Sequence, residues 1–285
     1  TQSYKEHEND SRILQRAYSL KAALEHLTIR VNPEELIVGN RTSGIRCGIV
    51  FPESGCSWID SEFETLPTRA QDKFLVKQED IEYFRNEIKP YWKGKSLEDV
   101  LFETYGEEIK EISKVVKINQ KDHAQGHICP DCIRWLHMGP KGLKEEADRK
   151  LKEETEQSKR EFYQSVSIVM EAASCFMNRY ANKMEMYLEN KKYFKYSETI
   201  KQVIANCRNL AQKPAQNFHE ALQSIWFLFV ILHMESNASS FSPGRLDLIL
   251  WPYYERDMET GILSKEAALE LIESLWLKFN EIVYL

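Results

Sequence analysis

The alternation of apolar and polar positions along the chain predicts a protein built mainly of helices. Apolar residues recur at steps of three and four through Ser11–Leu27 and through Glu161–Leu188, the spacing that places them on one face of a helix. The run Ile225–Leu232 is apolar throughout and predicts a helix buried on all sides. Because a helix needs about 20 apolar residues to cross a bilayer, this run is too short to be a span, and we expect no membrane partner.

Local signals mark where other helices begin. Asn217–Glu220 has the spacing of a capping box, in which the Asn side chain accepts from the third helical amide and the Glu side chain reaches back. Lys141–Glu161 is dense in Lys and Glu at helical spacing, which we interpret as the solvated face of a helix. Another helix starts at Ser264, and its buried stripe is expected to contain Ala268, Leu271, Ile272, Leu275, Trp276 and Phe279.

One stretch favours extended structure. Leu36–Phe51 is short and rich in Gly and β-branched residues, and these features are typical of strands. It is the only good strand signal in the sequence, so we predict a strand or extended structure there.

Composition narrows the class of protein. The chain has 285 residues, of which 42% are hydrophobic, and this is enough for a large core. A net charge of −6 argues against a phosphate-binding surface, so we expect no nucleic-acid partner. Six cysteines in a chain of this length do not form a disulfide scaffold and fit a reducing cytoplasm. The apolar end Ile282–Leu285 carries no terminator, and we expect more chain to follow.

The densest cluster of reactive side chains lies in a loop that contains His123, His127, Cys129, Asp131 and Cys132. The cysteines and a histidine could bind zinc, although no second pair follows at finger spacing. They could instead form a thioredoxin-type pair, which needs a strand before it and a helix after it. A third interpretation places His127 and Asp131 in a substrate pocket. The structural alternative is that Asp131 caps a helix and His127 is a hydrogen-bonded loop residue.

A second polar cluster follows the most apolar helix. Hydroxyl and amide groups between Glu235 and Asp247 need hydrogen-bond partners, which a ligand or the neighbouring backbone can supply. Ser239 and Ser240 are candidate pocket donors, but capping and turn roles explain them equally well. Arg245 and Asp247 are expected to form a structural ion pair.

Several short motifs in this order resemble the N-terminal region of glycyl-radical enzymes of the pyruvate formate-lyase superfamily. They are Asn32–Asn40, Phe51–Glu53, Trp58–Ile59, Leu66–Asp72, Pro90–Lys95, Gly126–His127, Phe218–Trp226, Glu235–Asn237, Ser242–Asp247 and Pro252–Asp257. Within the superfamily, the sequence is most similar to the branch that holds glycerol and diol dehydratases, choline trimethylamine-lyase and hydroxyproline dehydratase.

This resemblance implies a fold and a partner set. Residues 1–285 would be the mostly α-helical N-terminal portion of a ten-stranded α/β barrel, in a homodimer. No cofactor would be bound directly, because a separate S-adenosylmethionine-dependent [4Fe-4S] activase installs a radical on a glycine of the enzyme itself. That glycine and the cysteine that forms the thiyl radical would both lie beyond the matched region. The resemblance therefore implies that none of the six cysteines is catalytic.

The resemblance also implies a substrate shell and a reaction. Carried over by position, the substrate-binding candidates are His127, Asp131, His123, Ser239 and Ser240. The expected reaction is the cleavage of a C–O or C–N bond in a small hydroxylated substrate under anaerobic conditions. The loop around His127 lacks the arginine that a sulfonate substrate would favour. An arylacetate decarboxylase is the alternative within the enzyme class, and a zinc-binding helical interaction module is the alternative from another class.

Overall fold

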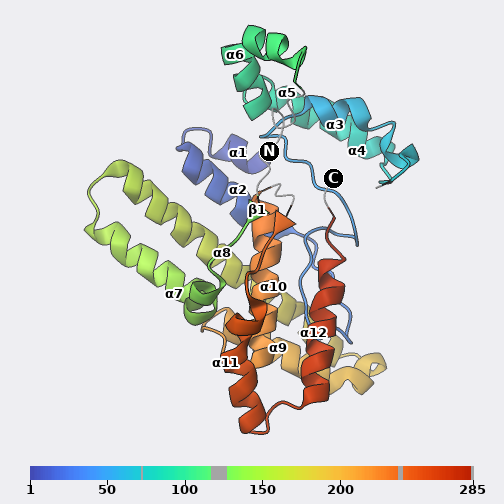
Figure 1. Cartoon of the computed structure of the whole chain (residues 1–285), viewed down its shortest axis with the longest axis vertical. Coiled ribbons are helices and arrows are strands. Elements are labelled where there is room, and N and C mark those ends of the chain that lie inside the picture. Colours follow the sequence, from blue (N-terminus) through green and yellow to red (C-terminus); the bar gives the residue numbers. More distant parts are fainter. Residues whose placement is uncertain (72, 117–126, 237–239, 284–285) are drawn as a thin grey trace.

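The computed structural model describes residues 1–71, 73–116, 127–236 and 240–283, and helices dominate these ranges (Figure 1). The helices are α1 Gln2–Glu6, α2 Arg12–His26, α3 Ser57–Glu62, α4 Gln78–Tyr83, α5 Lys89–Trp92, α6 Leu97–Ser113, α7 Cys132–Glu153, α8 Gln157–Leu188, α9 Ser197–Leu210, α10 Phe218–Glu235, α11 Leu246–Glu259 and α12 Lys265–Phe279. Shorter helical turns are Leu66–Thr68, Phe84–Ile88 and Lys191–Tyr196. The strands are β1 His127–Ile128 and β2 Ser240–Phe241. The prediction of a mostly helical segment is confirmed.

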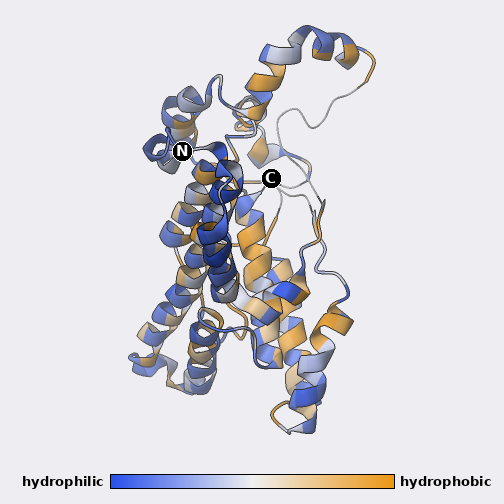
Figure 2. Cartoon of the chain, turned by 90° about the vertical axis from the view of Figure 1, so that its left-hand side faces the viewer, coloured by the Kyte–Doolittle hydropathy of each residue, from blue (hydrophilic) through white to orange (hydrophobic). Residues whose placement is uncertain are grey.

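Helix α10 runs through the middle of the main core, as the apolar run Ile225–Leu232 predicted. Figure 1 shows α10 between α8 on one side and α12 on the other, and Figure 2, coloured by hydropathy, shows its ribbon mostly in the orange of hydrophobic residues. Ile225, Trp226 and Phe227 are fully buried. The helix begins as expected, because the Asn217 side chain accepts from the Glu220 amide at 2.8 Å. The Glu220 carboxylate accepts from the amide of Gln216, one residue earlier than the capping box predicts.

The predicted strand at Leu36–Phe51 is wrong. In the structure this segment is an irregular loop, and its first part packs alongside α10. The backbone amide and carbonyl of Val38 bond to the side chain of Gln223 at 2.8 and 2.7 Å, and Trp226 Nε1 donates to the carbonyl of Gly39 at 3.1 Å. Side chains of a helix thus satisfy the backbone groups that a neighbouring strand would otherwise satisfy.

Gly39 is required for this close approach. Its φ is +145°, and a Cβ there would lie 2.5 Å from Trp226 Nε1, closer than any real contact. The next residue, Asn40, is also held by side chains, since its amide donates to the Tyr180 hydroxyl at 2.7 Å. The loop is therefore fixed on both sides of Gly39, and this places Arg41.

The charged stretch Lys141–Glu161 is not one continuous helix. Helix α7 ends at Glu153 and α8 begins at Gln157. Between them, the Glu154 carboxylate accepts from the amides of Thr155 and Glu156 at 2.9 and 3.0 Å. A side chain that accepts from the backbone amides of neighbouring residues competes with helical hydrogen bonds, so the prediction of a solvated helix holds only outside this break.

Helix α12 begins as predicted but buries fewer residues than expected. The Ser264 hydroxyl accepts from the amide of Ala267 at 3.1 Å, and Ala268, Leu271 and Leu275 are buried. Ile272 and Trp276, by contrast, are 37% and 55% exposed. The expected buried stripe therefore wrongly included Ile272 and Trp276, which lie at its edge.

A second, smaller hydrophobic cluster lies in the N-terminal part of the chain. Tyr4, Ile59, Phe84 and Trp92 are among its buried members, and they come from α1, α3, α5 and the turn Phe84–Ile88. Among the described residues, no helix combines the length and apolar character of a membrane span.

Candidate functional site

The two strands bring the two polar clusters of the sequence together. β1 and β2 pair in parallel, with His127 opposite Ser240 and Ile128 opposite Phe241. The pairing is extended by the amide of Ser242, which donates to the carbonyl of Ile128 at 2.7 Å. A residue of the first candidate loop and a residue of the second are therefore neighbours in one sheet.

The other predicted site residues are placed less directly. Asp131 is exposed and caps α7, since its carboxylate accepts from the amide of Arg134 at 2.9 Å. This is the capping role that the sequence left open, and it uses one of the two carboxylate oxygens, Oδ1. His123 and Ser239 lie outside the described residues, so their roles stay predictions.

The cysteines of the first loop differ in environment. Cys129 is exposed and Cys132 is buried. Burial raises the pKa of the Cys132 thiol to about 11, so this sulfur is protonated at neutral pH and is a weak nucleophile. No set of three potential metal ligands comes together within the described ranges, which do not include His123.

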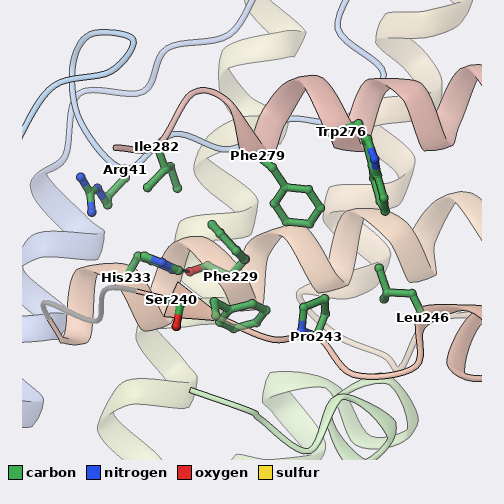
Figure 3. Close-up of a pocket in the computed structure, with 10 residues that line it drawn as sticks. Arg41, Phe229, His233, Ser240, Pro243, Leu246, Trp276, Phe279 and Ile282 are labelled. Atoms are coloured by element: carbon green, nitrogen blue, oxygen red, sulfur yellow. Dashed lines mark hydrogen bonds between the residues drawn. The ribbon is translucent and has the colours of Figure 1, made fainter. Parts of the chain in front are cut away.

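Next to β2 lies a pocket of about 390 Å³. Its lining comes from the loop after Gly39, from α10, β2 and α12, and from the start of α11. The residues are Arg41, Phe229, His233, Ser240, Phe241, Pro243, Leu246, Trp276, Phe279 and Ile282. Figure 3 shows Arg41, His233 and Ser240 at one end and Trp276 with Leu246 at the other. The pocket thus has a polar end beside Ser240 and a long apolar wall.

Arg41 brings a positive charge to the polar end. The residue is only 6% exposed, and its Nη2 donates to the backbone carbonyls of Cys47, at 3.3 Å, and of Val283. Its buried Nε has no partner among the described residues, and no carboxylate among them forms an ion pair with it. Burial lowers the pKa of Arg41 to about 10, so the guanidinium stays charged at neutral pH.

His233 lies beside this charge and is also 6% exposed. Its Nδ1 is 2.9 Å from the carbonyl of Phe229, and because a carbonyl only accepts, Nδ1 must carry the proton. Burial lowers the pKa of His233, and the nearby charge of Arg41 lowers it further, against the raising effect of the carbonyl. The imidazole is therefore neutral at pH 7, with Nε2 as an acceptor.

Sequence reasoning missed both Arg41 and His233. Arg41 directly follows the motif Asn32–Asn40, but nothing in its spacing announces a buried charge. His233 directly follows the run Ile225–Leu232 for which burial was predicted, and nothing in the sequence indicated that it lines a pocket. Ser240 was singled out by the sequence, and it lines this pocket.

The whole chain, residues 1–285, matches the family model described as pyruvate formate lyase-like. The probable dehydratase YbiW of Escherichia coli is 31% identical, over 99% of this chain and 36% of that protein. The isethionate sulfite-lyase of Oleidesulfovibrio alaskensis is 30% identical, again over 99% and 36%. The glycerol-bound form of the B12-independent glycerol dehydratase from Clostridium butyricum superposes with a TM-score of 0.93 at 32% identity, covering 100% of this chain and 37% of that chain.

These comparisons confirm the resemblance that the sequence motifs indicated. The chain spans little more than a third of the length of the curated relatives that it matches. The family match runs from the first to the last residue, and the helical arrangement agrees with a solved glycerol dehydratase over the whole chain. The chain belongs to the pyruvate formate lyase-like family.

Proposed function

We propose that this chain is part of a glycyl-radical lyase that cleaves a C–O or C–N bond of a small hydroxylated substrate under anaerobic conditions. The single observation that carries the proposal is the β1–β2 register, with His127 opposite Ser240, next to a pocket that Ser240 lines. Two segments that the family resemblance assigns to the substrate shell are neighbours in space. The names of the relatives, a probable dehydratase and a glycerol dehydratase, agree with this chemistry.

The proposed reaction divides the work between parts of the protein. An S-adenosylmethionine-dependent activase installs the glycyl radical, and this radical leads to the removal of a hydrogen atom from a carbon of the substrate. The residues of this chain bind and orient the substrate and manage protons. Elimination needs a base for one hydroxyl proton and a donor for the departing group. We assign the proton step to His127 and hydrogen bonds to the substrate to Ser240, with Asp131, His123 and Ser239 as further contacts. The activase and a second copy of the chain are the proposed partners, in the cytoplasm.

The experiment that tests this function uses the complete gene product, purified without oxygen and treated with its activase and S-adenosylmethionine. We expect a glycyl-radical signal by electron paramagnetic resonance. We also expect conversion of a hydroxylated substrate to a carbonyl compound and water, as from 1,2-propanediol to propionaldehyde. Glycerol, choline and isethionate are tested beside it, because relatives at this level of similarity include both a glycerol dehydratase and a sulfite-lyase. The activase is first shown to be active on another glycyl-radical enzyme. If this active activase then produces no radical signal in the protein, the proposal is contradicted.

A further inference from the structure

Arg41 is a buried cation for which the described part of the chain supplies no counter-charge. Only 6% of Arg41 is exposed, so 94% of the residue is buried. The two acceptors that its guanidinium contacts are backbone carbonyls, which carry no charge. Nε is buried without a partner among the described residues, and no hydrogen bond from Nη1 is found there. A charge removed from water is stable only when it is paired or fully hydrogen-bonded. The guanidinium therefore has donors left for a ligand.

The neighbours of Arg41 do not replace that counter-charge. His233 is neutral at pH 7, Ser240 carries a hydroxyl, and no other side chain of the lining carries a charge. Lys278, the other cation that is buried among the described residues, shows the contrast: it is 4% exposed and contacts both Glu35, at 2.6 Å, and Glu281, at 3.0 Å. The fold thus pairs one buried cation with carboxylates and presents the other to a pocket.

We infer that this pocket binds a small carboxylic acid, with the carboxylate against Arg41 and the apolar body along Phe229, Phe279 and Trp276. The charge fits, because a charge-assisted bond between guanidinium and carboxylate is stronger than one between neutral groups. The size fits as well, since about 390 Å³ admits a short aliphatic or a single-ring acid. A hydroxyl on such an acid would find the Nε2 acceptor of His233 and the Ser240 hydroxyl nearby.

That the pocket binds an acid does not depend on the proposed function. That this acid is the substrate rests on the proposed function. It narrows the hydroxylated substrate from a neutral diol to a hydroxycarboxylic acid. The binding is measured in the complete protein before activation, so that it does not depend on radical formation.

The experiment compares acids with the alcohols in which CH₂OH replaces the carboxylate. The pairs are lactate with 1,2-propanediol, 3-hydroxybutyrate with 1,3-butanediol, and benzoate with benzyl alcohol, and affinity is measured by titration calorimetry. In at least one pair we expect the acid to bind more tightly by about tenfold or more, the effect of a single charge-assisted bond. Arg41→Gln should remove this preference, because the glutamine amide carries no charge. The control is Arg46→Gln, which alters an exposed arginine of the same loop and should leave the preference intact.

Three results would overturn the inference: equal or tighter binding of the alcohol in every pair, a preference that survives Arg41→Gln, or a preference lost equally in Arg46→Gln. A carboxylate supplied by another part of the protein would give the first of these. If Arg41→Gln does not fold, Arg41→Met decides, since it removes the charge and keeps an unbranched side chain. Loss of the preference in that variant supports the inference, and a preference that survives contradicts it. Turnover of neutral diols without acid binding would contradict the inference and keep the proposed function, whereas acid binding without radical formation would do the reverse.

Discussion

His127 and Ser240 lie opposite one another in the parallel β1–β2 pair. The two residues come from loops that the sequence separates by α7, α8, α9 and α10, so only the fold brings them together. Because the strands comprise His127–Ile128 and Ser240–Phe241, the pairing is short and depends on the packing around it. Measurements of stability therefore test the contacts that hold this pair in place, and measurements of turnover test the pocket.

Asp131 offers a test that distinguishes capping from substrate binding. Removal of its carboxylate in Asp131→Ala takes away the acceptor for the Arg134 amide, and loss of such a cap costs about 1 kcal/mol of unfolding free energy. Asp131→Asn keeps an acceptor oxygen and should be nearly as stable as the wild type. Both are measured by urea denaturation. If Asp131 also contacts the substrate, Asp131→Asn will lower turnover at unchanged stability; full turnover would reduce the residue to a cap.

Gly39 tests how tightly the loop that carries Arg41 is held. A methyl group there would lie 2.5 Å from Trp226 Nε1, at a φ of +145°. We expect Gly39→Ala to lower the unfolding free energy by about 2–3 kcal/mol, through overpacking and backbone strain. Gly94→Ala is the matched control, because φ is also positive, at +77°, but no atom lies within 4 Å of the added Cβ. The control should cost about 1 kcal/mol, and equal losses in the two variants would argue against a tight contact.

His233 predicts a dependence of stability on pH. Its pKa in the folded protein is lowered below 6.5 by burial and by Arg41, so the unfolded chain binds a proton more readily. The stability that the neutral imidazole contributes is therefore complete above pH 6.5 and falls as the pH drops below that value, by at most about 1.4 kcal/mol per pH unit for one proton. Denaturation between pH 7 and pH 5 should show a smaller loss of stability in His233→Asn than in the wild type.

His26→Asn is the control for that measurement. His26 makes the same bond, from Nδ1 to the carbonyl four residues earlier, at 2.9 Å, but it is exposed on α2. His26→Asn thus makes the same substitution at an exposed site, and a change of slope equal to that of His233→Asn would contradict the assignment to His233. A wild-type slope that persists in His233→Asn would show that other groups, such as the buried His219, whose pKa is also lowered, account for the effect.

The sequence allowed the helical elements to be predicted wherever one local rule decided the structure. The cap at Asn217, the start at Ser264 and the buried run Ile225–Leu232 all depend on residues close together in the chain, and all are confirmed. The segment Leu36–Phe51 was mistaken for a strand because its β-branched residues are typical of strands. The backbone groups of Val38 and Gly39 instead bond to the side chains of Gln223 and Trp226, contacts that periodicity cannot reveal.

The candidate site was only partly predictable for the same reason. Ser240 stood out because hydroxyl groups follow a buried helix, and the motif Gly126–His127 drew attention to β1. Arg41 and His233 are significant only because distant segments meet at one pocket. A buried arginine whose acceptors are backbone carbonyls has no signature in the linear sequence.

The most direct test of the central claim, that β1 and β2 contribute to the active site of a glycyl-radical lyase, is the turnover of His127→Ala in the activated complete protein. Removal of a general acid or base should lower turnover by about 100-fold or more, while the glycyl-radical signal keeps its wild-type intensity, since the radical is installed elsewhere. His26→Ala should change neither quantity. Wild-type turnover in His127→Ala, at equal radical content, would contradict the account.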